Sequence, residues 1–163
     1  MPQETALYDG LTVEQNMKFY GEIFGLNKDV VTCRIKDLLD FVDLQIWKDK
    51  MVGNLSGGMK HRVSLACTLI HQPEILFLDE PTVRVDPELR VSFWSYFNLL
   101  KEAGTTILIT THYIDEARHC DRIGFIKGGK LIAENKPSKL LVETGTDSLE
   151  DAFLEFSKSE ATQ

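Results

Sequence analysis

A glycine pair at the start of a helical segment offers a place for an anion. The pair follows a serine in the run Leu55, Ser56, Gly57, Gly58 and Met59. Ser56 can cap the helix, and the two glycines leave the N–H groups of the first turn open to a phosphate. One apolar stripe supports the helix that follows, at Met59, Val63, Ala66, Cys67 and Ile70. The alternative interpretation is a well-capped core helix with a glycine-rich entry.

Two acids at the end of a short apolar run suit a metal-bound phosphate. The run from Ile75 to Leu78 predicts a strand that is buried on both faces, as in a parallel sheet. Asp79 and Glu80 follow at the end where ligands bind in open α/β sheets. Because neighbouring strand residues point to opposite faces, one acid can hold Mg²⁺ while the other orients or deprotonates a water. The alternative is a solvated acidic turn before Pro81.

Together with three further segments, these runs resemble the motifs of the ATP-binding cassette (ABC) family of transporter ATPases, in order and in spacing. Residues 55–59 look like the family's signature, and residues 75–80 look like its Walker B strand with the catalytic glutamate. The other matches are Gln3 with the Q-loop glutamine, Val85-Asp86-Pro87 with the D-loop and Thr110-Thr111-His112 with the switch-histidine segment. The run 111–117 is most similar to exporters of the G and H subfamilies and to bacterial drug exporters.

The resemblance implies an α/β fold, with a partial P-loop NTPase-type (RecA-like) parallel sheet and a helical subdomain. It also implies ATP and Mg²⁺ as cofactors, with Asp79 and Gln3 at the metal. Glu80 is then expected to be the general base, and Gln3 and His112 are expected to sense the γ-phosphate. The remaining nucleotide contacts are expected from Leu55, Ser56, Gly57, Gly58 and Asp86, with the glycines clamping the ATP of an opposite subunit.

The position of His112 in the sequence also supports a functional role for this residue. It follows an apolar, β-branched strand predicted over residues 105–111, so it is expected on the same side of the sheet as Asp79 and Glu80. A hydrogen bond from this side chain to the γ-phosphate or to the attacking water is expected. The other histidines lie on predicted helices and are interpreted as surface or packing residues: His61, His71 and His119.

The partners and the activity also follow from the resemblance. It implies ATP hydrolysis coupled to transmembrane transport, in a head-to-tail dimer with a second ABC ATPase domain. A transmembrane domain would hold the chain at the cytoplasmic face of a membrane and would choose the transported substrate. The net charge of −7 argues against a nucleic-acid partner, because duplex binders present a basic face.

A P-loop, Gly-x-x-x-x-Gly-Lys-Ser/Thr, does not occur in the sequence. The nearest string runs from Gly53 to Gly58, and Met59 stands where the lysine is required. The expectation is therefore a fragment of an ABC ATPase domain that lacks its amino-terminal Walker A part and is inactive alone. The first alternative is a non-catalytic half-domain that regulates a partner ATPase or membrane subunit. An ABC-type ATPase of translation or DNA repair ranks last, because the long insertions or tandem cassettes of those relatives do not occur here.

One residue departs from the family's pattern. Arg84 stands two residues before Asp86, where the family normally has glycine or serine. This loop packs against the partner domain in the family, so a long cation there puts tight dimer closure in doubt. The alternative is that Arg84 points into solvent and is tolerated.

Composition sets the remaining limits. The chain has 163 residues, 43% of them hydrophobic and 26% charged, which is typical of one globular domain. No apolar stretch approaches the roughly 20 residues that cross a bilayer, and no signal peptide is visible. The three cysteines form no metal-type pair and are interpreted as reduced thiols without a function.

Local patterns predict the elements that position these residues. Thr12 and Gln15 fit a capping box before a helix that ends near Phe24, and a second helix runs from about Lys28 to Asp43. After Pro73 strand and helix alternate, which predicts a parallel sheet. The further expected elements are a helix from Asp86 to Gly104, the strand over 105–111, a short helix over 114–120, a hairpin over 123–133, and helices over 136–143 and 148–156. The expected parts are a Q-loop segment (1–11), a helical subdomain with the signature (12–72), a partial core (73–135) and C-terminal helices with a tail (136–163).

Overall fold

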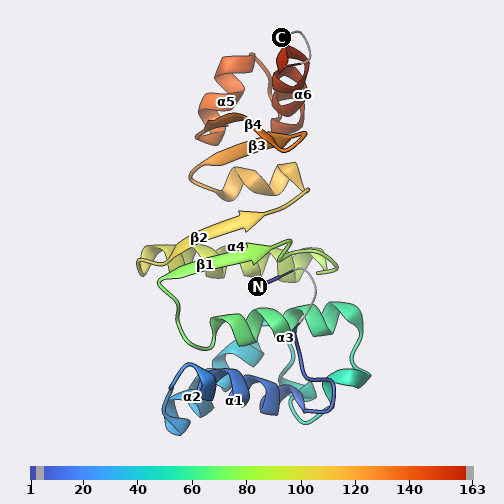
Figure 1. Cartoon of the computed structure of the whole chain (residues 1–163), viewed down its shortest axis with the longest axis vertical. Coiled ribbons are helices and arrows are strands. Elements are labelled where there is room, and N and C mark those ends of the chain that lie inside the picture. Colours follow the sequence, from blue (N-terminus) through green and yellow to red (C-terminus); the bar gives the residue numbers. More distant parts are fainter. Residues whose placement is uncertain (3–5, 161–163) are drawn as a thin grey trace. The chain divides into compact units, whose positions relative to one another are not determined.

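The computed structural model describes residues 1–2 and 6–160, so Gln3 lies outside the described residues. The chain divides into two compact units, Met1–Thr110 and Thr111–Gln163. The first unit holds three helices, a parallel pair of strands and a long connecting helix, and the second holds a hairpin with short helices (Figure 1). No helix in the described part of the chain is long and apolar enough to cross a membrane.

The first unit begins with a group of three packed helices. Helix α1 (Val13–Ile23) starts at the predicted capping box, in which Thr12 and Gln15 exchange two hydrogen bonds. Helix α2 (Lys28–Phe41) starts at Asn27, whose side chain accepts from the N–H of Asp29. The two helices approach closely at Gly21, where a Cβ would lie 2.7 Å from Val31 Cγ2. The starts of α1 and α2 are thus set by the polar residues that cap them, Thr12 and Asn27.

Helix α3 (Gly57–Leu69) contacts both α1 and α2. Two short 3₁₀ turns, Gln45–Trp47 and Val52–Asn54, lead into it. The helix buries Val63, Ala66 and Cys67, as the predicted stripe requires, but it also buries Leu65 and Leu69 on other faces. The single stripe is thus an incomplete description, because α3 is the central helix of its unit and is covered on several sides.

The sheet of the first unit is a parallel pair of strands. Strand β1 (Ile75–Asp79) pairs with β2 (Thr106–Thr110) in the register that sets Phe77 opposite Leu108. Helix α4 (Pro87–Glu102) connects the two strands and buries Phe93, Trp94 and Phe97. On the other edge of β1, the Met1 amino group donates to the carbonyl of Phe77 and the N–H of Asp79 donates to the carbonyl of Met1. The predicted parallel arrangement of strand, helix and strand is confirmed.

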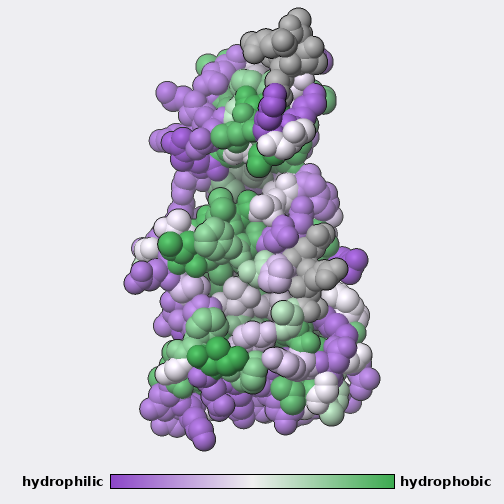
Figure 2. All heavy atoms as spheres, in the orientation of Figure 1, coloured by the Kyte–Doolittle hydropathy of each residue, from purple (hydrophilic) through white to green (hydrophobic). Residues whose placement is uncertain are grey.

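The burial of β1 differs from the expectation. Leu76 and Leu78 are buried, but Ile75 is 57% exposed and Phe77 is 61% exposed, with Leu108 of β2 beside them at 57%. Apolar side chains gather over β1 and β2 in the space-filling view (Figure 2). The prediction of a strand buried on both faces is therefore wrong for the described chain, because helices cover one face and no described element covers the other.

The second unit packs a hairpin against short helices. The 3₁₀ helix η3 (Ile114–His119) precedes the antiparallel strands β3 (Ile123–Lys127) and β4 (Lys130–Asn135). Helices α5 (Pro137–Thr144) and α6 (Leu149–Glu160) follow, and Gly145 ends α5 in the left-handed conformation. The buried core of this unit consists of Ala117, Ile123, Phe125, Leu140, Leu149 and Ala152. All of the elements predicted for this part of the chain are present.

Candidate functional site

The glycine turn forms the first turn of α3, as predicted. Ser56 is its N-cap, and the Ser56 hydroxyl accepts a hydrogen bond from the N–H of Met59 at 3.2 Å. Leu55 is buried before the cap, whereas Ser56 and Gly57 are exposed. The first-turn N–H groups therefore lie at the surface, at the positive end of the helix dipole, where an anion is stabilised.

Arg84 lies beside this turn. A Cβ at Gly58 would lie 2.8 Å from the backbone carbonyl of Arg84, and a Cβ at Gly57 would lie 3.2 Å from Nη1 of its guanidinium. Arg84 also has a positive φ of 60°, a conformation that glycine adopts at little cost. The side chain is exposed, but its cation stands beside the glycine turn of the same chain.

The two glycines should respond differently to alanine. Gly58→Ala is expected to lower the free energy of unfolding by about 1–2 kcal/mol, because overpacking against a backbone carbonyl outweighs the better helix propensity of alanine. Gly57→Ala is the matched control, since its Cβ meets only the flexible end of the Arg84 side chain. Urea denaturation of both variants checks this, and equal stabilities would contradict the close packing of Arg84 on Gly58.

The acid pair lies at the carboxyl end of β1, as predicted. Asp79 is the last residue of the strand, and its carboxylate accepts a hydrogen bond from the hydroxyl of Thr110 on β2. Glu80 follows in the left-handed conformation, with φ of 50°. Its N–H donates to the carbonyl of Thr110 at 3.0 Å. The alternation of side chains between the two faces of β1 therefore stops at Asp79. The left-handed turn sets the direction in which the chain leaves the strand at Glu80.

His61 is a residue of this site that the sequence pattern did not reveal. Its ring is buried, and Nε2 lies 3.0 Å from the carbonyl oxygen of Glu80 and 3.2 Å from that of Pro81. Carbonyls only accept, so Nε2 carries the proton and donates to both. Burial lowers the pKa of the His61 imidazole; the two carbonyl hydrogen bonds oppose this shift and Arg84 adds to it. The histidine interpreted as a surface or packing residue is therefore a buried donor to the acid turn.

Asp86 belongs to the first unit and His112 to the second. Asp86 caps α4, and its Oδ1 accepts from the N–H of Leu89 at 3.0 Å. His112 belongs to the second unit, is exposed, and has its ring 4.2 Å from that of Tyr113. The approach of His112 to Asp79 and Glu80 stays a prediction.

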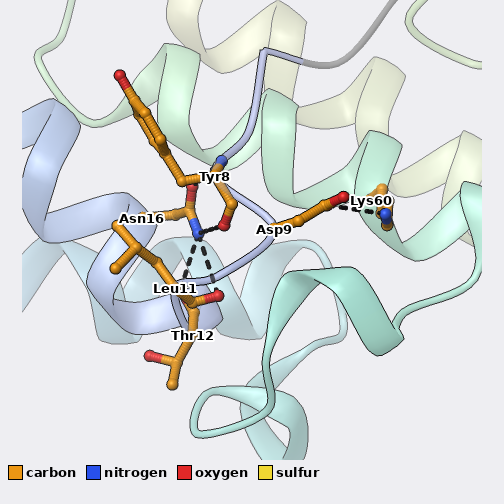
Figure 3. Close-up of polar contacts among 6 residues, drawn as sticks. All are labelled: Tyr8, Asp9, Leu11, Thr12, Asn16 and Lys60. Atoms are coloured by element: carbon orange, nitrogen blue, oxygen red, sulfur yellow. Dashed lines mark hydrogen bonds and ion pairs between the residues drawn. The ribbon is translucent and has the colours of Figure 1, made fainter.

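The segment from Tyr8 to Thr12 is fixed to the helical group (Figure 3). The buried Asn16 amide accepts from the N–H of Tyr8 at 2.9 Å and donates to the carbonyls of Tyr8 and Thr12. Asp9 forms an ion pair of 2.9 Å with Lys60, in the first turns of α3. This segment is therefore held close to the start of α3, although Gln3 itself is outside the described residues.

The residues present fit a magnesium ion that is shared with phosphates. Among the described residues, no three His, Cys, Asp or Glu side chains gather closely enough to hold a metal ion by themselves. Asp79 supplies one exposed carboxylate at the strand end. Mg²⁺ in nucleotide sites is typically bound by one or two carboxylates together with phosphate oxygens and waters, so one carboxylate here is sufficient.

Comparison with known proteins shows the family of the chain. The family model described as ABC transporter matches residues 1–83. The chain is 41% identical over 155 residues to the probable multidrug ABC transporter ATP-binding protein YbhF of Escherichia coli K12, covering 95% of the chain and 27% of that protein. It is 42% identical over 152 residues to the Nod factor export ATP-binding protein I of Burkholderia lata, covering 92% of the chain and 50% of that protein. The chain thus spans about a quarter to a half of these relatives.

Solved structures show the same fold. An ATP-binding subunit of an ABC transporter superposes with a TM-score of 0.88 at 25% identity, over 96% of this chain and 66% of that chain. An ATP-binding cassette solved as a dimer in a post-hydrolysis state with ADP and phosphate gives a TM-score of 0.75 at 28% identity, over 83% of this chain and 60% of that chain. The predicted α/β fold of the P-loop NTPase type is confirmed.

Proposed function

Because the chain belongs to the ABC transporter family, we propose that it supplies the signature and Walker B part of an ATPase domain that drives export across a membrane. The observation that carries this proposal is the acid pair Asp79 and Glu80 at the carboxyl end of a parallel strand. The glycine turn of α3 lies in the same unit, so one chain presents both an anion-binding turn and a hydrolytic acid pair. The similarity to drug and Nod factor exporters supports export as the direction of transport.

The roles of the acids follow from their surroundings. We propose that Asp79 holds Mg²⁺, since Thr110 orients its exposed carboxylate at the strand end. Glu80 would take the proton from the attacking water, and its position beyond the strand separates it from the metal-binding carboxylate. ATP, when bound, supplies the phosphoryl group that is transferred to water. His112 and Gln3 would contact the γ-phosphate side of the nucleotide.

The partners are proposed from the glycine turn and from the relatives. Leu55 to Gly58 would contact the ATP of a second ATPase domain, and Asp86 would lie at the same head-to-tail interface. The dimeric cassette among the solved structures supports such a pairing. A transmembrane domain would hold the assembly at the cytoplasmic face of a membrane through the helical subdomain (12–72), with the partial core (73–135) carrying the acids.

A second candidate function is regulation without catalysis. The observation that favours it is an exposed apolar face on the parallel strands, where Ile75, Phe77 and Leu108 are each more than half exposed. Such a half-domain would bind a partner ATPase or a membrane subunit, and the exposed apolar face of β1 and β2 would then be covered by that partner.

One measurement, ATP hydrolysis by an extended version of the chain, distinguishes the two functions. An extended version, in which the P-loop segment of an ABC family member precedes Met1, is expected to hydrolyse ATP with Mg²⁺. The same extension with its P-loop lysine replaced by alanine is the control. Phosphate release above this control supports the enzyme, whereas no release from a folded, ATP-binding extended version supports the regulatory candidate.

Replacement of Arg84 by glycine is expected to strengthen the ATP-dependent dimer of the extended version. Glycine adopts the left-handed conformation at little cost, and its introduction removes the cation that stands beside Gly57. The dimer dissociation constant is expected to fall by about threefold to tenfold, since such a change is worth about 1 kcal/mol. Sedimentation velocity with ATP measures it. An unchanged dimer fraction would show that Arg84 does not restrict closure.

A further inference from the structure

We propose that His61 is a positioning residue that holds the backbone of Glu80 in its left-handed turn and thereby ties the orientation of the general base to helix α3. The inference rests on the proposed role of Glu80 in hydrolysis. His61 itself touches no reacting atom; it acts through the two carbonyls that its ring binds.

The hydrogen bonds converge on the residue whose conformation is strained. Glu80 has φ of 50°, which residues other than glycine seldom adopt without support from their surroundings. Its N–H donates to Thr110, and its carbonyl accepts from the N–H of Val83 as well as from His61 Nε2. The second His61 contact, at 3.2 Å, fixes the carbonyl of Pro81. The imidazole therefore bridges two successive peptide units, Glu80–Pro81 and Pro81–Thr82.

The position of His61 makes this contact specific. His61 is 5% exposed, so water does not readily replace its ring as a donor to the carbonyls. His61 lies one turn after Gly57 and Gly58 in the same helix, and α3 is packed against α1 and α2. A shift of the glycine turn would therefore be carried by a rigid helix to the backbone of the predicted base.

The substitutions of His61 for the test are chosen by the number of bonds between Cα and the donor nitrogen. In glutamine, the amide nitrogen is as many bonds from Cα as Nε2 is in histidine, so His61→Gln keeps a donor at the same reach. Asparagine carries the same amide one bond shorter, and leucine keeps similar bulk without a donor. If the hydrogen bonds to the carbonyls matter, glutamine rescues the turn, whereas asparagine and leucine do not.

The test uses the full 163-residue chain. Hydrogen exchange measured by mass spectrometry follows the amides of residues 80–86, with a peptide of α1 as an internal reference. In His61→Leu and His61→Asn, exchange in the 80–86 peptide is expected to be about tenfold faster than in the wild type, since a buried carbonyl loses its donor. In His61→Gln it is expected to stay within about threefold. Equal exchange in the glutamine and leucine variants would overturn the proposal.

A spectroscopic measurement on the wild-type chain keeps the test independent of whether the variants fold. The ¹⁵N spectrum of the histidine rings is expected to show His61 as the neutral tautomer with the proton on Nε2 at pH 7.5. A proton on Nδ1 would overturn the proposal. Neither readout needs nucleotide, so loss of ATPase activity in the extended version would refute the enzyme and leave this positioning role to be decided separately.

In the extended version, the role has a kinetic consequence. His61→Leu is expected to lower kcat for ATP hydrolysis by about tenfold while KM for ATP changes less than about twofold, since the general base and not nucleotide binding is disturbed. His61→Gln is expected to retain most of the activity. A rise of KM for ATP in His61→Leu, without a change of kcat, would contradict a role of His61 through Glu80.

Discussion

Replacement of Glu80 by glutamine is expected to lower the rate of ATP hydrolysis by about 10²–10⁴-fold in the extended version. The amide keeps the shape of the side chain at the end of β1 but cannot accept a proton from water. Hydrogen bonds from the backbone of Glu80, among them its N–H to Thr110 and its carbonyl to His61, do not involve the carboxylate and survive the substitution. ATP binding is therefore expected to remain intact.

The matched control for this change lies at the other end of the same strand. Glu74 precedes β1 and is exposed, so Glu74→Gln removes the same charge far from the predicted reaction centre. Steady-state phosphate release and binding of a fluorescent ATP analogue are measured for both variants. Turnover like that of the wild type in Glu80→Gln would remove Glu80 from the mechanism, and equal losses in both variants would point to a general charge effect.

The elements of the fold were predictable because their signals are local. The capping box at Thr12 and Gln15, the Asp86 cap before Pro87 and the apolar run before Asp79 each act within a few residues. The parallel pairing of β1 and β2 followed from the alternation of strand and helix. The same locality made the glycine turn predictable, since a serine cap and two glycines specify the start of α3.

The features that were missed depend on residues far away in the sequence. Whether Phe77 is buried is decided by what covers the second face of the sheet, and the apolar run alone does not contain that information. His61 binds carbonyls about twenty residues later, and no spacing rule connects a helix position with a turn after a strand. The contact of Arg84 with Gly58 likewise arises only when the loop before α4 folds back onto α3.

The chain alone is expected to bind ATP far more weakly than the extended version. In this fold, the backbone N–H groups and the lysine of the P-loop neutralise the β- and γ-phosphates. The described acids of the site, Asp79 and Glu80, add negative charge where phosphates would lie, and the whole chain carries a net charge of −7. Two or three charge-assisted hydrogen bonds at about 1.5–3 kcal/mol each correspond to at least about 10²-fold in affinity.

The central claim is that this chain provides the hydrolytic and signature part of an ATPase domain and needs a P-loop segment to hold the nucleotide. It is tested most directly by titrating the chain and the extended version in parallel with a fluorescent ATP analogue and Mg²⁺. The expected result is a dissociation constant for the chain at least about 10²-fold higher than that for the extended version. Equal affinity of a monomeric chain and the extended version would contradict the claim, because another stretch of these 163 residues would then hold the phosphates.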